Sequence, residues 1–317
     1  MTTKQQPLNS GFGATTTTRE VLGTTRLDGT VAIVTGGYAG IGLETTRALQ
    51  AAGATVIVPA RTPDKARAAL SGWERVELEP LDLMDPASID AFASRFLASG
   101  RPLHLLINNA GVMASPLSRD SRGFESQFAT NHLGHFQLTV RLWPALKQAN
   151  GARVVCLSSR GHFFSDVDFE DPNFHQRPYD KWVAYGQSKT ANILFAVGLD
   201  ARGEAHRVRA FAVHPGAILT ELVRSMSEEE VRASTENSNK LEPMKTPEQG
   251  AATTVWCATS RQLEGMGGVY CENVDIAVIA PPESTVRRGV KAYAVDPKRA
   301  DRLWTASEAW TGVRFDP

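Results

Sequence analysis

The stretch that most constrains the fold is a short apolar run followed by a glycine-rich turn. Residues 31–34 read VAIV, which has the length and the β-branched content of a buried strand. The segment 35–42 follows directly and reads TGGYAGIG, and residues 43–52 have the pattern of a helix. Glycine permits a tight turn and close approach of the backbone, and a helix start presents free N–H groups to a phosphate. Strand, turn and helix in this order predict a nucleotide-binding unit.

Short apolar runs alternate with amphipathic segments along most of the chain from Thr30 onward. This alternation is typical of a parallel sheet covered by helices on both faces. We therefore expect the α/β class, with a single Rossmann-type doubly wound parallel sheet of about seven strands. The predicted strands are 31–34, 55–58, 76–81, 104–107, 153–157, 208–213 and 268–271.

We expect three parts in the chain. Residues 1–29 form a polar, partly mobile leader with one short helix, which begins after a capping-box pattern at Thr17. Residues 30–280 form the nucleotide-binding domain. Residues 281–317 form a helical extension packed on the same domain, with Asp296 as the N-cap of its helix.

Composition excludes several classes of partner. Thirty-four acidic residues balance thirty-four Lys and Arg, so no net charge attracts the protein to nucleic acid or to an anionic membrane. No apolar run approaches the length of about 18 residues that a membrane span needs, and the start of the chain has no apolar signal core. The three cysteines lie in apolar runs, the pattern of reduced thiols. We expect a cytoplasmic protein with a small-molecule partner.

Tyr185 and Lys189 stand four residues apart in a helical pattern, so their side chains can point into the same cleft. A phenol has a pKa of about 10, and proton transfer near neutral pH needs that pKa lowered by about 3 units. A neighbouring cation can supply much of this shift. The alternative is a Tyr and a Lys on a solvated helix face.

Three motifs together resemble the short-chain dehydrogenase/reductase family. They are the TGxxxGxG turn at 35–42, the NNAG sequence at 108–111 and the YxxxK pair at 185–189. The resemblance extends from about Thr30 to Cys271 and points to the single-domain, non-extended branch. The long segment 160–184 looks like that of retinol-dehydrogenase-like members and of the related oxidoreductase that carries WW domains.

The resemblance implies a site for NAD(H) or NADP(H). The predicted strand 55–58 is followed by Pro, Ala and Arg61, with no acid to accept hydrogen bonds from the ribose of NAD. Arg61 can instead contact the 2′-phosphate of NADP, so we favour NADP(H) over NAD(H), the alternative being a surface arginine. In the family an Asp at the position of Asp82 lies near the adenine. The expected cofactor-binding residues are Gly36, Tyr38, Gly40, Ile41, Arg61, Asp82, Leu83, Asn109, Ala110, Gly111, Tyr185, Lys189, Pro215, Gly216 and Thr220.

Family roles carry over to four catalytic candidates. Tyr185 would be the general acid or base, and Lys189 would lower its pKa and bind the nicotinamide ribose. Ser159 would hold the substrate oxygen, with Ser158 as the alternative. Asn131 would hold a water in a proton relay to the Lys; a polar residue that kinks or caps a buried helix is the competing account.

The sequence predicts no metal site. His132 and His135 are three residues apart, but no acidic or Cys ligand pattern accompanies them.

The segments expected to contact substrate are the insertion 160–184 and the loop 217–245. Five of the aromatic residues in the insertion favour the rim of a hydrophobic pocket over a surface hairpin. The extension 281–317 covers either this pocket or only the sheet, and the sequence leaves both open. These five aromatic residues are Phe163, Phe164, Phe169, Phe174 and Trp182.

The resemblance therefore implies an NADP(H)-dependent oxidoreductase that moves a hydride between the nicotinamide and a carbonyl or alcohol carbon of a hydrophobic small molecule. Reduction of an activated C=C bond, as in protochlorophyllide reductases, is one alternative. A nucleotide-sensing protein without turnover is another, disfavoured because both Tyr185 and Lys189 are present. Family habit implies a homodimer or homotetramer. The identity of the substrate is not encoded in any recognisable pattern.

Overall fold

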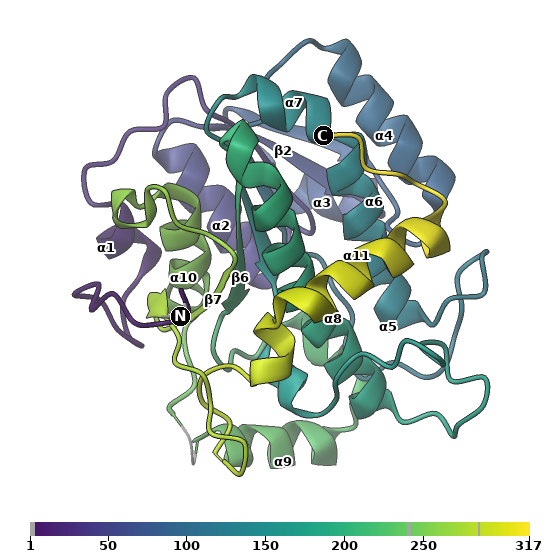
Figure 1. The fold of residues 1–317 in the computed structure, drawn as a ribbon. Coiled ribbons are helices and arrows are strands. Elements are labelled where there is room, and N and C mark those ends of the chain that lie inside the picture. Colours follow the sequence, from purple (N-terminus) through teal and green to yellow (C-terminus); the bar gives the residue numbers. More distant parts are fainter. Residues whose placement is uncertain (1–3, 240–241, 285) are drawn as a thin grey trace.

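A sheet in the order β3-β2-β1-β4-β5-β6-β7-β8 crosses the computed structural model, which describes residues 4–239, 242–284 and 286–317 (Figure 1). Strands β1 to β7 pair in parallel, and β8 pairs antiparallel with β7. The strand order reverses between β1 and β4, where ligands bind in open α/β sheets. The strands are β1 (Val31–Val34), β2 (Thr55–Ala60), β3 (Val76–Pro80), β4 (Leu105–Asn108), β5 (Arg153–Leu157), β6 (Arg209–His214), β7 (Val269–Glu272) and β8 (Asp275–Ile276).

Helices cover both faces of this sheet, which confirms the predicted doubly wound fold. They are α1 (Thr18–Leu22), α2 (Gly40–Ala51), α3 (Pro63–Ala69), α4 (Pro86–Ala98), α5 (Ser126–Phe128), α6 (Gly134–Arg141), α7 (Trp143–Gln148), α8 (Lys181–Gly203), α9 (Glu228–Asn239), α10 (Pro247–Thr259) and α11 (Pro297–Thr311). A π-helical turn, Ala129–Leu133, joins α5 to α6, and a 3₁₀ turn, Arg160–Phe163, follows β5.

Two apolar layers enclose the sheet because successive side chains of a strand point to opposite faces. In β2, Ile57 packs into the layer that contains residues of α4, α6 and α8. Its neighbours Val56 and Val58 pack into the layer that contains Leu49 of α2 and Trp256 of α10. Strands buried on both faces, such as β1, β2 and β4, appear in the sequence as apolar runs. The edge strand β3 is less buried and reads VELEP, an alternating pattern. All seven parallel strands were predicted from these patterns.

Local capping signals define the starts of several helices. Thr17 accepts a hydrogen bond from Glu20 N, and Thr246 accepts one from Gln249 N, each within a capping box. Asp296 accepts from the backbone at the start of α11. These caps satisfy N–H groups that an α-helix leaves without a partner. The helices predicted after Thr17 and Asp296 are confirmed.

Within the predicted loop 217–245 the structure has more order than the sequence pattern indicates. A 3₁₀ turn, Glu221–Ser225, and helix α9 occupy much of this segment, and residues 240–241 lie outside the described part of the chain. Three glutamates, Glu228 to Glu230, occupy the first turn of α9. Their negative charge interacts favourably with the positive end of the helix dipole.

The leader contacts the edge of the sheet that β7 and β8 form. The Gln5 side chain donates to Tyr270 O at 2.7 Å and to Ala277 O at 2.6 Å, and it accepts from Tyr270 N at 2.8 Å. One amide side chain thus makes hydrogen bonds that another strand could otherwise make with these backbone groups.

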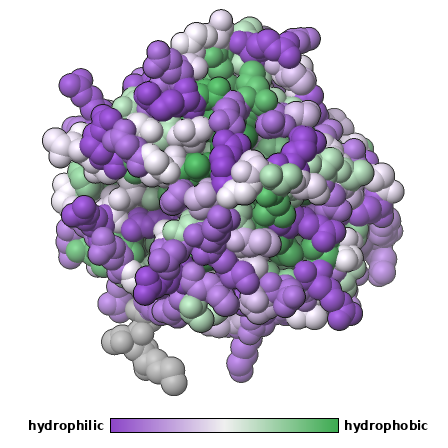
Figure 2. Space-filling view, turned by 90° about the horizontal axis from the view of Figure 1, so that it is seen from above, coloured by the Kyte–Doolittle hydropathy of each residue, from purple (hydrophilic) through white to green (hydrophobic). Residues whose placement is uncertain are grey.

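In the described part of the chain, no helix combines the length and the apolar character that crossing a bilayer requires. The face shown in Figure 2 is largely hydrophilic, with apolar side chains in small separate areas.

The C-terminal helix α11 lies across α8 (Figure 1). Trp304 of α11 is 3% exposed, and its ring stacks on Phe195 of α8 with centroids 5.8 Å apart. Phe136 of α6 meets the same indole edge to face at 5.2 Å. Aromatic burial of this kind anchors the extension to the core of the sheet domain.

We predict that Trp304→Ala lowers the free energy of unfolding by about 3–5 kcal/mol, because it leaves a large cavity between α11, α8 and α6. Urea denaturation measures the change, with the exposed Thr305→Ala on the same helix as control. A loss below about 1 kcal/mol would show that α11 docks only loosely.

Candidate active site

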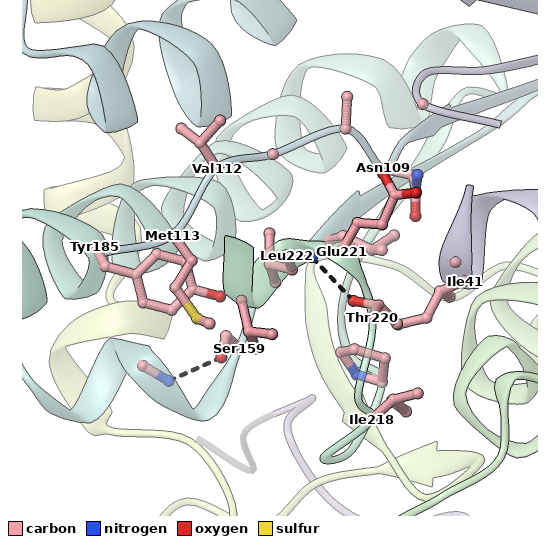
Figure 3. A pocket seen from close by; sticks show the side chains of 18 of the residues that line it. Ile41, Asn109, Val112, Met113, Ser159, Tyr185, Ile218, Thr220, Glu221 and Leu222 are labelled. Carbon is pink, nitrogen blue, oxygen red and sulfur yellow. Dashed lines mark hydrogen bonds between the residues drawn. The ribbon is translucent and has the colours of Figure 1, made fainter. Parts of the chain in front are cut away.

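A cavity of about 1100 Å³ opens at the carboxyl ends of the central strands, at the point where the strand order reverses. Figure 3 shows its two halves, with Ile41, Asn109 and Thr220 on one side and Ser159 and Tyr185 on the other. Every predicted cofactor-binding residue lines this cavity, as do Ser159, Tyr185 and Lys189. Asn131 does not.

The glycine-rich turn is shaped for close approach of a ligand. Gly36 has φ +65°, in the left-handed region that favours glycine. A Cβ on Gly42 would clash with the carbonyl oxygen of Gly36 and would lie 2.5 Å from Asn109 Nδ2. Helix α2 begins after Ala39, which offers no side-chain cap, so its first N–H groups are available to an anion. This turn therefore fits a dinucleotide pyrophosphate.

Thr35 connects the turn to the NNAG segment. Its Oγ1 accepts hydrogen bonds from Asn109 N and Ala110 N, both at 2.9 Å. The Asn109 side chain donates back to Thr35 O at 2.7 Å. These bonds hold the ends of β1 and β4 together beneath the cavity.

His135 extends this connection to Asn131. Its Nε2 lies 2.8 Å from Thr35 Oγ1, and its Nδ1 lies 3.0 Å from Asn131 O. Burial lowers the pKa of His135 to about 4, so the ring is neutral near pH 7. The Nε2 of His132, by contrast, lies 2.8 Å from Ser307 Oγ of α11. Among the described residues, no group of His, Cys, Asp and Glu has the arrangement of a metal site.

Arg61 and Asp82, which follow strands β2 and β3, both line the cavity. Arg61 is exposed, and Lys65 next to it forms an ion pair with Glu221. The Asp82 carboxylate accepts from Met84 N at 2.9 Å, so it also orders its own loop. Leu83 is buried and lines the cavity beside Asp82.

Tyr185 and Lys189 are both buried on α8, with exposures of 3% and 4%. Lys189 Nζ lies 5.6 Å from the centre of the Tyr185 ring and donates to Leu157 O at 3.0 Å. Burial lowers the pKa of Lys189 to about 8. It raises the pKa of Tyr185 to about 12, and a hydrogen bond with Ser159 opposes this rise.

Burial thus raises the pKa of Tyr185 in this structure, and the lowering of that pKa by Lys189 stays a prediction. Desolvation outweighs the other influences on the phenol, and the opposing hydrogen bond comes from Ser159. The ammonium group of Lys189 is directed to the Leu157 carbonyl at the end of β5.

Ser159 and Ser158 have different surroundings. Ser159 Oγ accepts from Gly161 N at 3.0 Å (Figure 3). The Ser159 hydroxyl lines the cavity and hydrogen-bonds the Tyr185 phenol. Ser158 is buried, and its hydroxyl donates to Lys189 O at 2.8 Å. The geometry therefore favours Ser159 as the group that contacts a substrate oxygen.

Asn131 lies in the π-helical turn, a form of backbone frequent at functional sites. Its Oδ1 accepts from Val112 N at 2.9 Å, and its Nδ2 donates to Val112 O and to Ser188 Oγ. A Cβ on Gly111 would lie 3.0 Å from Asn131 Oδ1 and 3.6 Å from Lys189 Nζ. Glycine at this position thus lets both polar groups approach the backbone closely.

Two of the five aromatic residues predicted to form the rim reach the cavity. They are Phe164 and Trp182, whose ring centroids are 5.9 Å apart. The expectation of an aromatic rim is wrong for Phe163, Phe169 and Phe174, which do not line the cavity. Loop 217–245 contributes further apolar lining, namely Ile218, Leu219, Leu222, Val223, Val231 and Met244.

The C-terminal extension contacts both the sheet domain and the cavity. Helix α11 packs on α8, whereas Arg287 lines the cavity, with its guanidinium carbon 4.4 Å from the centre of the Phe164 ring. Sequence reasoning did not identify Arg287 or the linking role of His135, because no local pattern relates either residue to its distant partners.

We predict that Lys189→Met stabilises the fold by about 1–3 kcal/mol at pH 7. The pKa of Lys189 is about 8 in the folded protein against its ordinary value of 10.5, so burying the protonated amine costs about 3 kcal/mol below pH 8. Leu157 O keeps its bond from Asn192 Nδ2 at 2.8 Å. The advantage of the variant should disappear as the pH rises from 8 to 10.5.

Urea denaturation at several pH values measures this difference, with the exposed Lys298→Met as control. A variant less stable than the wild type at pH 7 would contradict the assigned cost of burial.

Comparison with known proteins agrees with this geometry. Residues 30–231 match the family model described as short chain dehydrogenase. A probable oxidoreductase of Streptomyces lividans is 46% identical over 289 residues, covering 88% of this chain and 96% of the relative. Mouse retinol dehydrogenase 12 is 38% identical over 305 residues, covering 92% and 89%.

Among solved structures, an uncharacterised protein of Mycobacterium paratuberculosis superimposes with a TM-score of 0.73. It is 32% identical, and the match covers 94% of this chain and 98% of that one. With a matching family model over most of its length and relatives well above 30% identity, this chain belongs to the short-chain dehydrogenase/reductase family of NAD(P)-dependent oxidoreductases.

Proposed function

We propose that the protein is an NADP(H)-dependent oxidoreductase that interconverts a carbonyl and an alcohol on a hydrophobic small molecule, with Tyr185 as general acid and base. The observation that carries the proposal is a single cavity with a phosphate-binding turn at one end and Tyr185, Ser159 and Lys189 at the other.

The cofactor half of the cavity would hold a dinucleotide. The pyrophosphate would lie at the N-terminus of α2, where Thr220 packs against Gly40 with its Cγ2 3.2 Å from where a Cβ on Gly40 would be. Arg61 would contact the 2′-phosphate, with Lys65 as a second cation near it. Bound NADPH supplies the hydride.

The remaining chemistry is carried out by side chains of the protein itself. In the reducing direction, the Tyr185 O–H would donate its proton to the oxygen of the reacting carbonyl as negative charge develops there. The Ser159 O–H would donate a hydrogen bond to the same oxygen. Lys189 would bind the nicotinamide ribose, and its charge would favour the phenolate that remains.

A path to resupply the proton would run past Gly111, where the Asn131 side chain and the Lys189 ammonium both approach the backbone. A water held between Asn131 and Lys189 would accept a hydrogen bond from the ammonium group. Lys189, with its pKa near 8, can exchange a proton with such a water near neutral pH.

Apolar side chains line part of the cavity, which supports a hydrophobic substrate. They include Met113, Phe164 and Trp182, together with Leu219 and Leu222 from loop 217–245. Side chains of this kind favour apolar surface by the hydrophobic effect. The mouse relative is named for retinol, an apolar alcohol, which fits the same substrate class.

We predict that Tyr185→Phe lowers kcat for reduction of apolar aldehydes by at least about 100-fold, because it removes the proton donor and keeps the ring. Oxidation of NADPH followed at 340 nm measures the rate. Tyr179→Phe is the matched control, since Tyr179 is a partly buried phenol outside the cavity. Full activity of the Tyr185 variant would exclude the assigned acid–base role.

A second variant tests the choice of cofactor. Arg61→Ala should raise the Kd of NADPH by about 10- to 100-fold and leave that of NADH within about threefold, because a charge-assisted bond to the 2′-phosphate contributes about 1.5–3 kcal/mol. Nucleotide fluorescence titration measures both constants, with Arg67→Ala on α3 as control. An equal loss for the two nucleotides would remove Arg61 from the 2′-phosphate site.

A further inference from the structure

We propose that His162 is a positioning residue, which fixes the turn that carries Ser159 and couples the C-terminal extension to the acid–base site. The inference rests on the proposed function of Ser159 and Tyr185. His162 does not line the cavity and acts through its neighbours.

Both ring nitrogens of His162 are engaged by backbone groups. The side chain is fully buried, with Nδ1 2.7 Å from Ser159 O and Nε2 3.2 Å from Lys291 N. Lys291 N can only donate, so Nε2 accepts and Nδ1 carries the proton. Burial lowers the pKa of His162 to about 4, which keeps this single neutral tautomer near pH 7.

The carbonyl of His162 is held from two further elements. It accepts the Tyr293 hydroxyl at 2.5 Å and the Thr190 hydroxyl of α8 at 3.3 Å. The turn 159–163 is therefore clamped between α8 on one side and residues 291–293 of the extension on the other. The ring of His162 also packs between Phe163 and Tyr270, at centroid distances of 4.5 and 5.2 Å.

The same turn touches both proposed catalytic groups. Ser159 Oγ is oriented by Gly161 N at 3.0 Å. Gly161 also packs against the phenol, since a Cβ there would lie 2.6 Å from Cε1 of Tyr185. A shift of the turn would thus displace the Ser159 hydroxyl and release the Tyr185 ring together. Displacements of about 1 Å at such groups can cost about 100-fold in rate.

Two isosteric variants separate the two bonds of the ring. In His162→Asn, the side-chain amide nitrogen takes the place of Nδ1 and can donate to Ser159 O, but nothing reaches Lys291 N. In His162→Gln, the amide oxygen takes the place of Nε2 and can accept from Lys291 N, while the bond to Ser159 O is lost.

We expect His162→Gln to lower kcat about tenfold or more with the KM for aldehyde within about threefold, and His162→Asn to retain at least about a third of kcat. The Kd of NADPH should stay unchanged in both, and thermal melting should show similar losses. Equal kcat for the two variants, or wild-type kcat in His162→Gln, would overturn the proposal.

Tyr293→Phe tests the coupling to the extension without altering the imidazole. It removes one donor to the His162 carbonyl and should lower kcat about threefold at unchanged NADPH affinity. An unchanged kcat in Tyr293→Phe would overturn the coupling of the extension to the acid–base site. This test holds even if neither His162 variant folds. If Tyr185→Phe loses activity while His162→Gln keeps the wild-type kcat, only this inference is refuted. If Tyr185→Phe keeps full activity, the proposed function is refuted.

Discussion

Burial of two ionisable side chains on one face of α8 is the constraint on which the site depends. Tyr185 and Lys189 lie at the inner end of the cavity, where water cannot easily stabilise a charge, and their pKa values move in opposite directions as a result. The Leu157 carbonyl at the end of β5 receives the ammonium group. The stability that this arrangement costs is supplied by the apolar layers on both faces of the sheet.

Neutral hydrogen-bonded links hold the site from two directions. On the cofactor side, Thr35 and His135 connect the ends of β1 and β4 to the π-helical turn at Asn131. On the substrate side, His162 connects Ser159 to the extension. Both imidazoles are buried with lowered pKa values, so neither link changes its charge near pH 7. A site built from such links can keep its geometry while the titrating groups exchange protons.

The sequence predicted what depends on local chemistry and missed what depends on distant partners. Apolar runs, together with the alternating pattern of β3, located the seven parallel strands, and capping residues such as Asp296 located helix starts. The two-residue strand β8 is too short to leave a pattern. The contact of His162 with Lys291 joins positions 129 residues apart, and the three aromatic residues that turn away from the cavity differ from Phe164 only in tertiary packing.

The measurement that tests the central claim most directly follows the hydride itself. NADPH carrying two deuterium atoms at C4 is incubated with the enzyme and an apolar α,β-unsaturated aldehyde, and the product is examined by mass spectrometry and NMR. The account predicts an allylic alcohol with one deuterium on the carbinol carbon and an intact C=C bond. A saturated product that keeps its carbonyl, or an alcohol without the label, would contradict it.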